Sequence, residues 1–177
     1  NSATVSTIKY LREKYPEIDF VGVEPAIKPA LKNNHAEPIG LLATKKTVMT
    51  YHSDILVDNI KIIKHHDPYL IDKIENDYHA ISDFDMQKAL DPFIEAGVKT
   101  VVLGCTHFYF LREKFADKFP EIQFLEPAPA VAKHVLEINS FYRMGECQFL
   151  VSGDVDNFRH FLENVVGYKN GDIRKVS

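Results

Sequence analysis

A thiol and an imidazole stand two positions apart in Gly104-Cys105-Thr106-His107, and these residue types could perform acid/base chemistry. A cysteine thiolate is a base and a nucleophile, and a nearby histidine can exchange a proton with the thiol or with a substrate amine. Thr106 offers a hydroxyl and an N–H to a carboxylate. The spacing alone does not establish contact, so a buried structural cysteine beside a capping or surface histidine is the alternative.

The position of this turn strengthens the chemical interpretation. It lies where an apolar strand over residues 100–103 is expected to pass into a helix. Ligands of parallel α/β sheets collect at the carboxyl ends of the strands, and N–H groups at a helix start attract anions. The same partial positive charge can lower the pKa of a thiol, which predicts a raised thiolate fraction at Cys105.

Short apolar segments alternate with helical patterns along the rest of the chain. We expect strands or apolar runs at 18–23, 39–44, 60–64, 100–103, 122–125 and 148–152. Helices are expected at 4–15, 46–59, 68–75, 85–96, 108–119, 129–138 and 155–166, with a frayed end after Gly167. This alternation predicts an α/β protein with a mainly parallel sheet.

Composition excludes several classes of function. A net charge of −4 in 177 residues argues against nucleic acid as the main partner. No apolar run approaches the roughly 18 residues that a membrane span needs. Two cysteines are too few for a disulfide framework, which favours a reducing, cytoplasmic setting. The second of them, Cys147, is expected to be filler within a strand.

His65-His66-Asp67 contains metal-ligand types, but adjacent side chains of a strand point to opposite faces of the sheet. No further histidine or cysteine lies nearby at the spacing of a zinc site. We therefore expect no metal ligands here.

The segment 101–108, Val-Val-Leu-Gly-Cys-Thr-His-Phe, closely resembles the second catalytic-cysteine motif of the glutamate racemases. Residues 21–30 resemble the segment where that family crosses between two lobes, and residues 42–48 resemble its threonine-bearing strand and turn. Residues 151–154 with Phe158 resemble its C-terminal strand and helix. The resemblance implies a two-lobed aspartate/glutamate racemase-like α/β fold with mainly parallel sheets. Residues 1–24 and 129–177 would form a partial first lobe, and residues 25–128 the second.

The resemblance implies racemisation of glutamate for peptidoglycan synthesis without cofactor or metal, by two cysteines on opposite faces of the α-carbon. Cys105 would be one acid/base group, assisted by His107 and supported by Glu75. The substrate's carboxylates and amine would be held by Asn1, Ser2, Thr44, Thr47 and Thr106. A homodimer would be compatible with the family.

The opening Asn1-Ser2-Ala3-Thr4 resembles the residues directly after the first catalytic cysteine of the family. We therefore expect that cysteine immediately before Asn1, and we expect the 177 residues alone to be inactive.

Three features depart from the family pattern. Tyr109 replaces a common proline, Asp67 replaces a small residue or cysteine before Pro68, and Glu126-Pro127 replaces an acidic-small pair.

Other functions remain open at the level of sequence. Aspartate and hydantoin racemases use the same two-cysteine mechanism. A non-catalytic carboxylate-binding module or pseudoenzyme would keep the pocket but would not turn over a substrate. A cysteine hydrolase using Cys105 and His107 lacks a recognisable Asn or Asp to orient the histidine. Glu75 could equally be a plain surface carboxylate of its helix.

Overall fold

The computed structural model describes residues 2–33, 37–50, 60–138, 147–169 and 171–176. Its centre is a four-stranded parallel sheet of β1 (Ile39–Leu42), β2 (Ile62–His65), β3 (Thr100–Leu103) and β4 (Gln123–Leu125), in the order β2-β1-β3-β4. The α/β class expected from the sequence is confirmed. Because all four strands are parallel, their carboxyl ends meet at one edge of the sheet.

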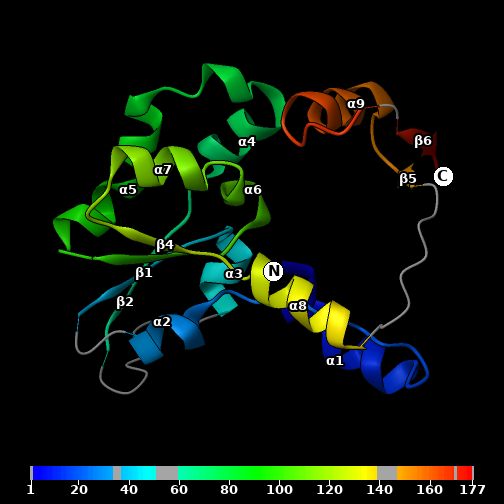
Figure 1. The fold of residues 1–177 in the computed structure, drawn as a ribbon, viewed down its shortest axis with the longest axis horizontal. Coiled ribbons are helices and arrows are strands. Elements are labelled where there is room, and N and C mark those ends of the chain that lie inside the picture. The colour runs from blue at the N-terminus through cyan, green and yellow to red at the C-terminus, as the bar shows by residue number, and fades with distance from the viewer. Residues whose placement is uncertain (1, 34–36, 51–59, 139–146, 170, 177) are drawn as a thin grey trace.

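Helices cover both faces of this sheet, as Figure 1 shows, with α4 (Pro68–Asn76), α5 (Asp83–Glu95) and α7 (Arg112–Lys118) on one face. The short helices α2 (Ile27–Asn33) and α3 (Lys45–Thr50) lie on the other. Successive strand residues alternate between the two layers: Leu42 packs with Phe93 of α5, and Leu41 packs with Ala30 of α2. Because both faces are covered, the buried strands read as continuous apolar runs.

The helix α4, which carries one of the candidate site residues, begins at a well-formed cap. The Asp67 carboxylate accepts a hydrogen bond of 2.9 Å from the N–H of Leu70, and Pro68 occupies the first helical position. The unusual aspartate before Pro68 is therefore a helix cap.

The expected strand at 18–23 is absent, and residues 19–25 form no regular element. Their backbone groups bond to α1 (Ser2–Lys14) instead of to a strand. The Val23 N–H donates to the Thr4 hydroxyl at 3.0 Å, and Arg12 donates to the Phe20 carbonyl at 2.9 Å. The backbone hydrogen-bonding groups of an apolar segment can thus be satisfied by side chains, without a neighbouring strand.

The expected helix at 108–119 is two helices, α6 (Thr106–Tyr109) and α7. At the break, the Tyr78 hydroxyl donates a 2.8 Å hydrogen bond to the Phe110 carbonyl. Tyr78 follows α4 in the short η1 helix (Tyr78–Ala80), so a distant residue secures the end of α6. The expected helix at 46–59 is described only as α3, since residues 51–59 lie outside the described part of the chain.

The C-terminal part of the chain forms a second, smaller sheet. Strand β5 (Gln148–Val151) pairs in parallel with β6 (Asp172–Lys175), and α9 (Val155–Asn164) connects them. The expectation of a frayed end after Gly167 is wrong, because β6 forms there. The strand was missed because it has only one apolar residue, Ile173, and so gives a weak strand pattern. Cys147 is exposed and precedes β5, so it is not filler within a strand.

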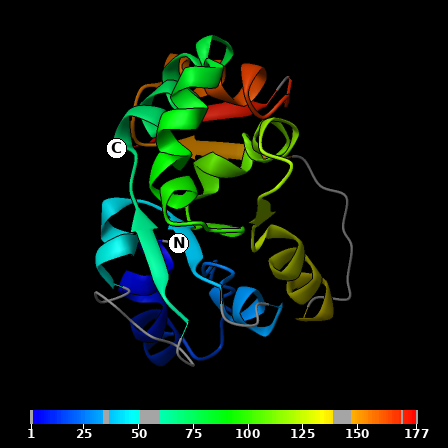
Figure 2. The same cartoon turned by 90° about the vertical axis from the view of Figure 1, so that its left-hand side faces the viewer.

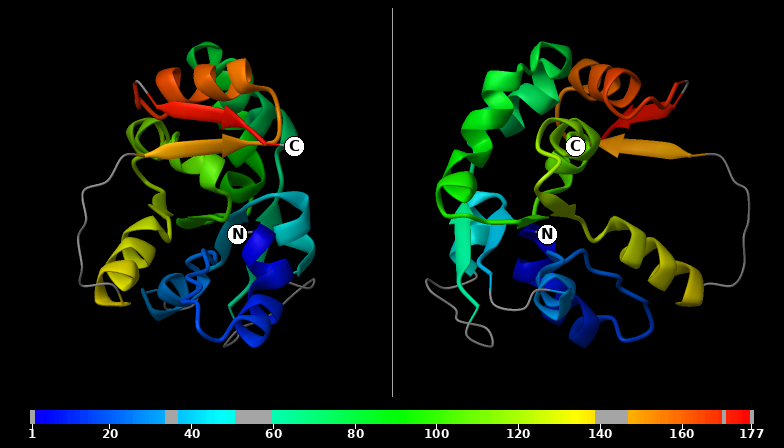
Figure 3. Two further views of the ribbon diagram at one scale, coloured as in Figure 1. Left: turned by 90° about the vertical axis from the view of Figure 1, so that its right-hand side faces the viewer. Right: turned by 60° about the vertical axis from the view of Figure 1, so that its left-hand side comes forward.

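The two-stranded sheet lies with α9 at one end of the molecule, opposite α1 and α2 (Figures 2 and 3). The helix α8 (Ala128–Ile138) lines one cavity together with α1. None of the helices among the described residues is long and apolar enough to cross a membrane.

We predict that amides of β5 and β6 exchange with solvent faster than those of β1 and β3. Every residue of β5 and β6 is at least partly exposed, whereas β1 is buried throughout, and a two-stranded sheet is marginal without packing. Hydrogen–deuterium exchange followed by mass spectrometry measures this difference. Equal protection in the two sheets would contradict it.

Candidate active site

Close backbone packing fixes the turn after β3. The Gly104 N–H donates a 2.7 Å hydrogen bond to the Leu42 carbonyl, which extends the pairing of β3 with β1 by one residue. A Cβ atom at Gly104 would lie 2.7 Å from Leu41 Cδ1 and 2.8 Å from Ala43 Cβ. Only glycine lets the turn settle this deeply, and Cys105 is thereby placed over the carboxyl edge of the sheet.

A chain of three side chains starts at this turn. The Cys105 Sγ lies 3.3 Å from the Nδ1 atom of His107, and the His107 Nε2 atom lies 2.6 Å from Glu75 Oε1 on α4. Cys105 is 5% exposed, while the Glu75 side chain is 49% exposed. The structure thus brings together the three residues that the sequence analysis grouped as catalytic.

Burial raises the pKa of the Cys105 thiol above its usual range. The N–H groups of His107 and Phe108 act in the opposite direction, and the negative charge of Glu75 adds to the increase. The expectation that the helix start would leave the thiol with a lowered pKa is therefore wrong. Desolvation of the thiolate outweighs the backbone dipoles of a helix only four residues long.

We predict that alkylation of Cys105 by iodoacetamide still accelerates as the pH rises past about 8.5, the pKa of an ordinary thiol, because only the thiolate reacts. A Cys147→Ser protein removes the exposed second thiol, and mass spectrometry follows the modified peptide against pH. Free cysteine under the same conditions is the control. A rate that levels off below about pH 8 would contradict the effect of burial.

A cavity of about 250 Å³ adjoins the thiol. It is lined by Ala3, Thr44, Ile71, Gly104, Cys105, Thr106 and His107. These described lining residues include no Lys or Arg. An anion in the cavity would therefore be bound by hydroxyl and N–H donors. Such donors suit the carboxylates of a small amino acid.

The threonines differ in their positions. Thr44 and Thr106 line the cavity, whereas Thr47 is fully buried behind Thr44, whose hydroxyl donates to the Thr47 hydroxyl at 3.1 Å. Ser2 begins α1 but its side chain is not described, and Asn1 lies outside the described residues. The neighbouring Ala3 lines the cavity, which puts the start of α1 beside Cys105.

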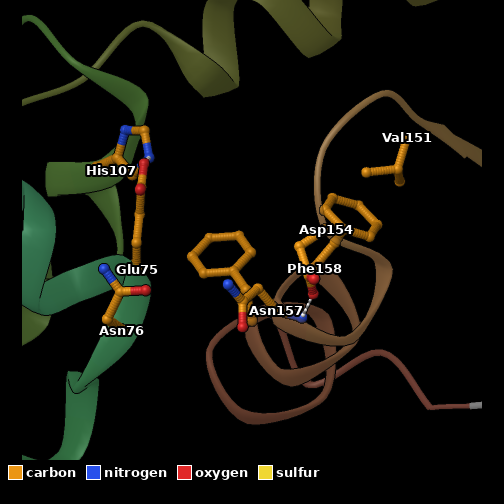
Figure 4. A pocket seen from close by; sticks show the side chains of 8 residues that line it. Glu75, Asn76, His107, Val151, Asp154, Asn157 and Phe158 are labelled. Carbon is orange, nitrogen blue, oxygen red and sulfur yellow. Dashed lines mark hydrogen bonds and ion pairs between the residues drawn. The ribbon is translucent and has the colours of Figure 1, made fainter. Parts of the chain in front are cut away.

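A second cavity, of about 380 Å³, lies on the other side of His107. Figure 4 shows Glu75 reaching His107 along one wall, with Asp154, Asn157 and Phe158 of the β5–α9 segment across the opening. The Asp154 carboxylate caps α9 by accepting from the Asn157 N–H at 2.8 Å. The imidazole of His107 therefore stands between the thiol cavity and the C-terminal helix.

Two of the departures from the family pattern now have structural roles. Glu126 forms an ion pair with Arg112 of α7, with 3.8 Å between Oε1 and Nε. Tyr109 packs against the main core cluster. Within the described residues, no group of three or more His, Cys, Asp or Glu side chains is arranged to hold a metal ion.

Sequence reasoning missed Ile71 and Phe161 as neighbours of the site. Ile71 lines the thiol cavity, and the Phe161 ring lies 6.4 Å from the His107 ring between centroids. Both belong to the apolar faces of amphipathic helices, where nothing separates a residue beside a site from one in the core. Residue spacing alone gave no partner for His107, since Glu75 is 32 positions away in the chain and was named only through the family resemblance.

Comparison with known proteins gives a consistent picture, although no protein-family model matches the chain. A glutamate racemase of Pseudomonas putida is 32% identical over 190 residues, covering 100% of this chain and 71% of that protein. A glutamate racemase isoform of Bacillus anthracis superposes with a TM-score of 0.77 at 23% identity, covering 99% of this chain and 71% of the other. The Escherichia coli glutamate racemase in complex with L-glutamate and the activator UDP-MurNAc-Ala gives a TM-score of 0.74 at 24% identity, covering 96% and 68%.

Proposed function

This chain belongs to the glutamate racemase family, and from that premise we propose that it interconverts L- and D-glutamate to supply D-glutamate for peptidoglycan. One observation carries the proposal. The Cys105–His107–Glu75 chain borders a small cavity whose walls offer hydroxyl and N–H groups to carboxylates. A proton-transfer site and a carboxylate-binding site are thereby adjacent.

The geometry suits removal of the α-proton by Cys105. When the His107 Nε2–H donates to Glu75, the Nδ1 atom can accept the thiol proton, which leaves a thiolate beside an imidazolium paired with a carboxylate. The thiolate then takes the α-proton of glutamate and becomes a thiol again. The electron pair left on the α-carbon delocalises into the α-carboxylate.

Inversion then requires an acid/base group on the opposite face of the α-carbon to return a proton there. In the reverse direction Cys105 donates the proton as a thiol, and its raised pKa favours the protonated form from which this step starts. The other cysteine of the sequence, Cys147, is exposed and does not line the cavity. We assign it no part in the reaction.

The substrate contacts in this proposal come from the threonines and from the start of α1. Thr106 donates its hydroxyl or backbone N–H group to the carboxylates of glutamate, and Thr44 donates its backbone N–H group, because its hydroxyl already donates to Thr47 and is positioned by it. Asn1 and Ser2 are proposed to contribute from the start of α1. This assignment is supported by Ala3, the next residue, in the cavity wall.

We further propose the division into lobes inferred from the sequence, residues 25–128 forming one lobe and residues 1–24 with 129–177 belonging to the other. The four-stranded sheet and the helices on its faces fall within 27–125, which supports the first of these units. Residues of α1 and α8 line one cavity, which supports their place in a common lobe, whereas α9 packs on the main core at the other end of the molecule. The cavity is bordered by α1 from one proposed lobe and by the β3 turn from the other. Glutamate would then bind between them.

Racemisation assays on glutamate and aspartate test the proposed function, using the protein at its natural length. We expect turnover of glutamate, detected by chiral chromatography, and much weaker turnover of aspartate. Activity on aspartate alone would overturn the substrate assignment.

A cysteine hydrolase is the second candidate because Glu75 orients His107, a role for which the sequence offered no recognisable Asn or Asp. Mass spectrometry of the protein quenched during turnover distinguishes the two reactions. An acyl-thioester on Cys105 would favour hydrolysis, and an unmodified thiol favours proton transfer.

The proposal includes a cytoplasmic location and assembly as a homodimer, both of which rest on the family. A catalytic thiol that must stay reduced suits the cytoplasm. Sedimentation equilibrium tests the assembly, and a monomer at working concentrations would exclude the homodimer.

A further inference from the structure

The imidazole of His107 is held at both ring nitrogens, yet these contacts leave one motion open. Nδ1 faces Cys105 at 3.3 Å, and Nε2 faces Glu75 at 2.6 Å. The Glu75 side chain is 49% exposed, so its contact with Nε2 does not by itself stop the ring from rotating about the Cβ–Cγ bond of His107. Rotation about this bond turns the lone pair of Nδ1 away from the thiol, and hydrogen bonds weaken steeply with misalignment. Something must therefore pack against the ring.

Phe161 of α9 supplies this packing. Its ring lies 6.4 Å from the His107 ring between centroids, with 51° between the ring planes. Phe161 is itself held edge-on by Phe110, at 5.6 Å and 90°, and both pack against the main core cluster. Phe110 follows α6 directly, and the Tyr78 hydroxyl bonds its carbonyl. The aromatic contact is thus anchored on the main core cluster.

We infer that Phe161 is a positioning residue for the reaction: its ring fixes the tilt of the His107 imidazole and so keeps Nδ1 aimed at the Cys105 thiol. This inference rests on the proposed function for its kinetic consequence, but the geometric claim about His107 stands apart from it. It also gives α9 a role in catalysis. The helix is distant in sequence from the thiol turn and reaches it through one side chain.

The same helix offers a matched control. Phe158 also packs an aromatic ring, but its partner is Phe149 of β5, at 5.7 Å between ring centroids. Substitution of Phe158 therefore loosens the attachment of α9 to its own sheet without removing the ring that faces His107. Leucine is the replacement of choice at both positions, because it keeps most of the apolar volume and helps the variants to fold.

Steady-state kinetics of the protein at its natural length form the first arm of the test. We expect Phe161→Leu to lower kcat about tenfold in both directions while KM changes less than about twofold, since misaimed acid/base groups slow the proton transfer. Phe161→Tyr keeps the ring and should stay within about twofold of the parent, as should Phe158→Leu. A kcat for Phe161→Leu equal to that of Phe158→Leu would overturn the inference.

Proton NMR of protein labelled with 13C at the histidine Cε1 atoms is the second arm and needs no turnover. The His107 signal is the one that disappears in His107→Gln. The ring current of Phe161 should displace it from the positions of exposed histidines. The displacement should be lost in Phe161→Leu and retained in Phe158→Leu. An unmoved signal in Phe161→Leu would overturn the inference, whereas an inactive parent with the expected NMR shifts would overturn only the proposed function.

Discussion

Replacing Cys105 with serine is expected to lower the rate of glutamate racemisation by at least about 10³-fold in both directions. A serine hydroxyl keeps the size and the hydrogen-bonding capacity of the side chain. It is far less acidic than a thiol, however, and gives almost no conjugate base near neutral pH. The two enantiomers of glutamate are equal in energy, so kcat/KM must fall equally for both. Circular dichroism or chiral chromatography measures each direction.

The matched control for this substitution is Cys147→Ser. Cys147 is the other free cysteine, is exposed, and lies outside the thiol cavity. Its replacement should leave the rate within about twofold, as expected for a surface change away from the site. Loss of activity in Cys147→Ser, or retention of more than about a tenth of the activity in Cys105→Ser, would contradict the assignment of the base.

Replacing His107 with glutamine is expected to lower kcat about 100-fold, the usual order of effect for removal of a positioned acid/base group. Among the described side chains, only His107 forms a hydrogen bond with the Cys105 sulfur. Burial raises the pKa of that thiol. Without a proton acceptor beside it, the thiol loses its route to the thiolate. Glutamine retains a polar group of similar length, so the cavity keeps its outline.

Glu75→Gln should act through the same chain of groups. The carboxylate contacts the far nitrogen of His107 and not the thiol itself, so its loss is expected to cost about tenfold. The double variant should be little slower than His107→Gln alone, because coupled groups give non-additive losses. The control is His79→Gln, an exposed histidine just beyond α4, which should keep full activity. Additive losses would show that Glu75 acts independently of His107.

The general architecture follows from local sequence patterns. The apolar runs of β1 and β3 alternate with helices of the length that parallel sheets require, and Gly104-Cys105 stands where a strand must end. Since the carboxyl ends of parallel strands share one edge, the place of Cys105 could be inferred from the sequence. Its contact with His107 is also local, because a turn of the backbone brings together two side chains that are two positions apart.

The remainder depends on contacts between distant parts of the chain. Glu75 and Phe161 meet His107 from α4 and α9, and no local pattern distinguishes either residue from its neighbours. The direction of the Cys105 pKa shift was also beyond sequence, because the depth of burial is a property of the packed turn. Strand β6 was missed for a related reason, since its pairing with β5 outweighs its polar composition.

The most direct test of proton transfer by Cys105 is the fate of the α-hydrogen in heavy water. With unlabelled L-glutamate, the parent protein should release D-glutamate carrying one deuterium at the α-carbon, while the remaining L-glutamate stays unlabelled at early times. Two bases on opposite faces predict this pattern, and Cys105→Ser should show neither labelled product nor exchange. Formation of deuterated D-glutamate by Cys105→Ser at the parental rate would contradict the role of the thiol.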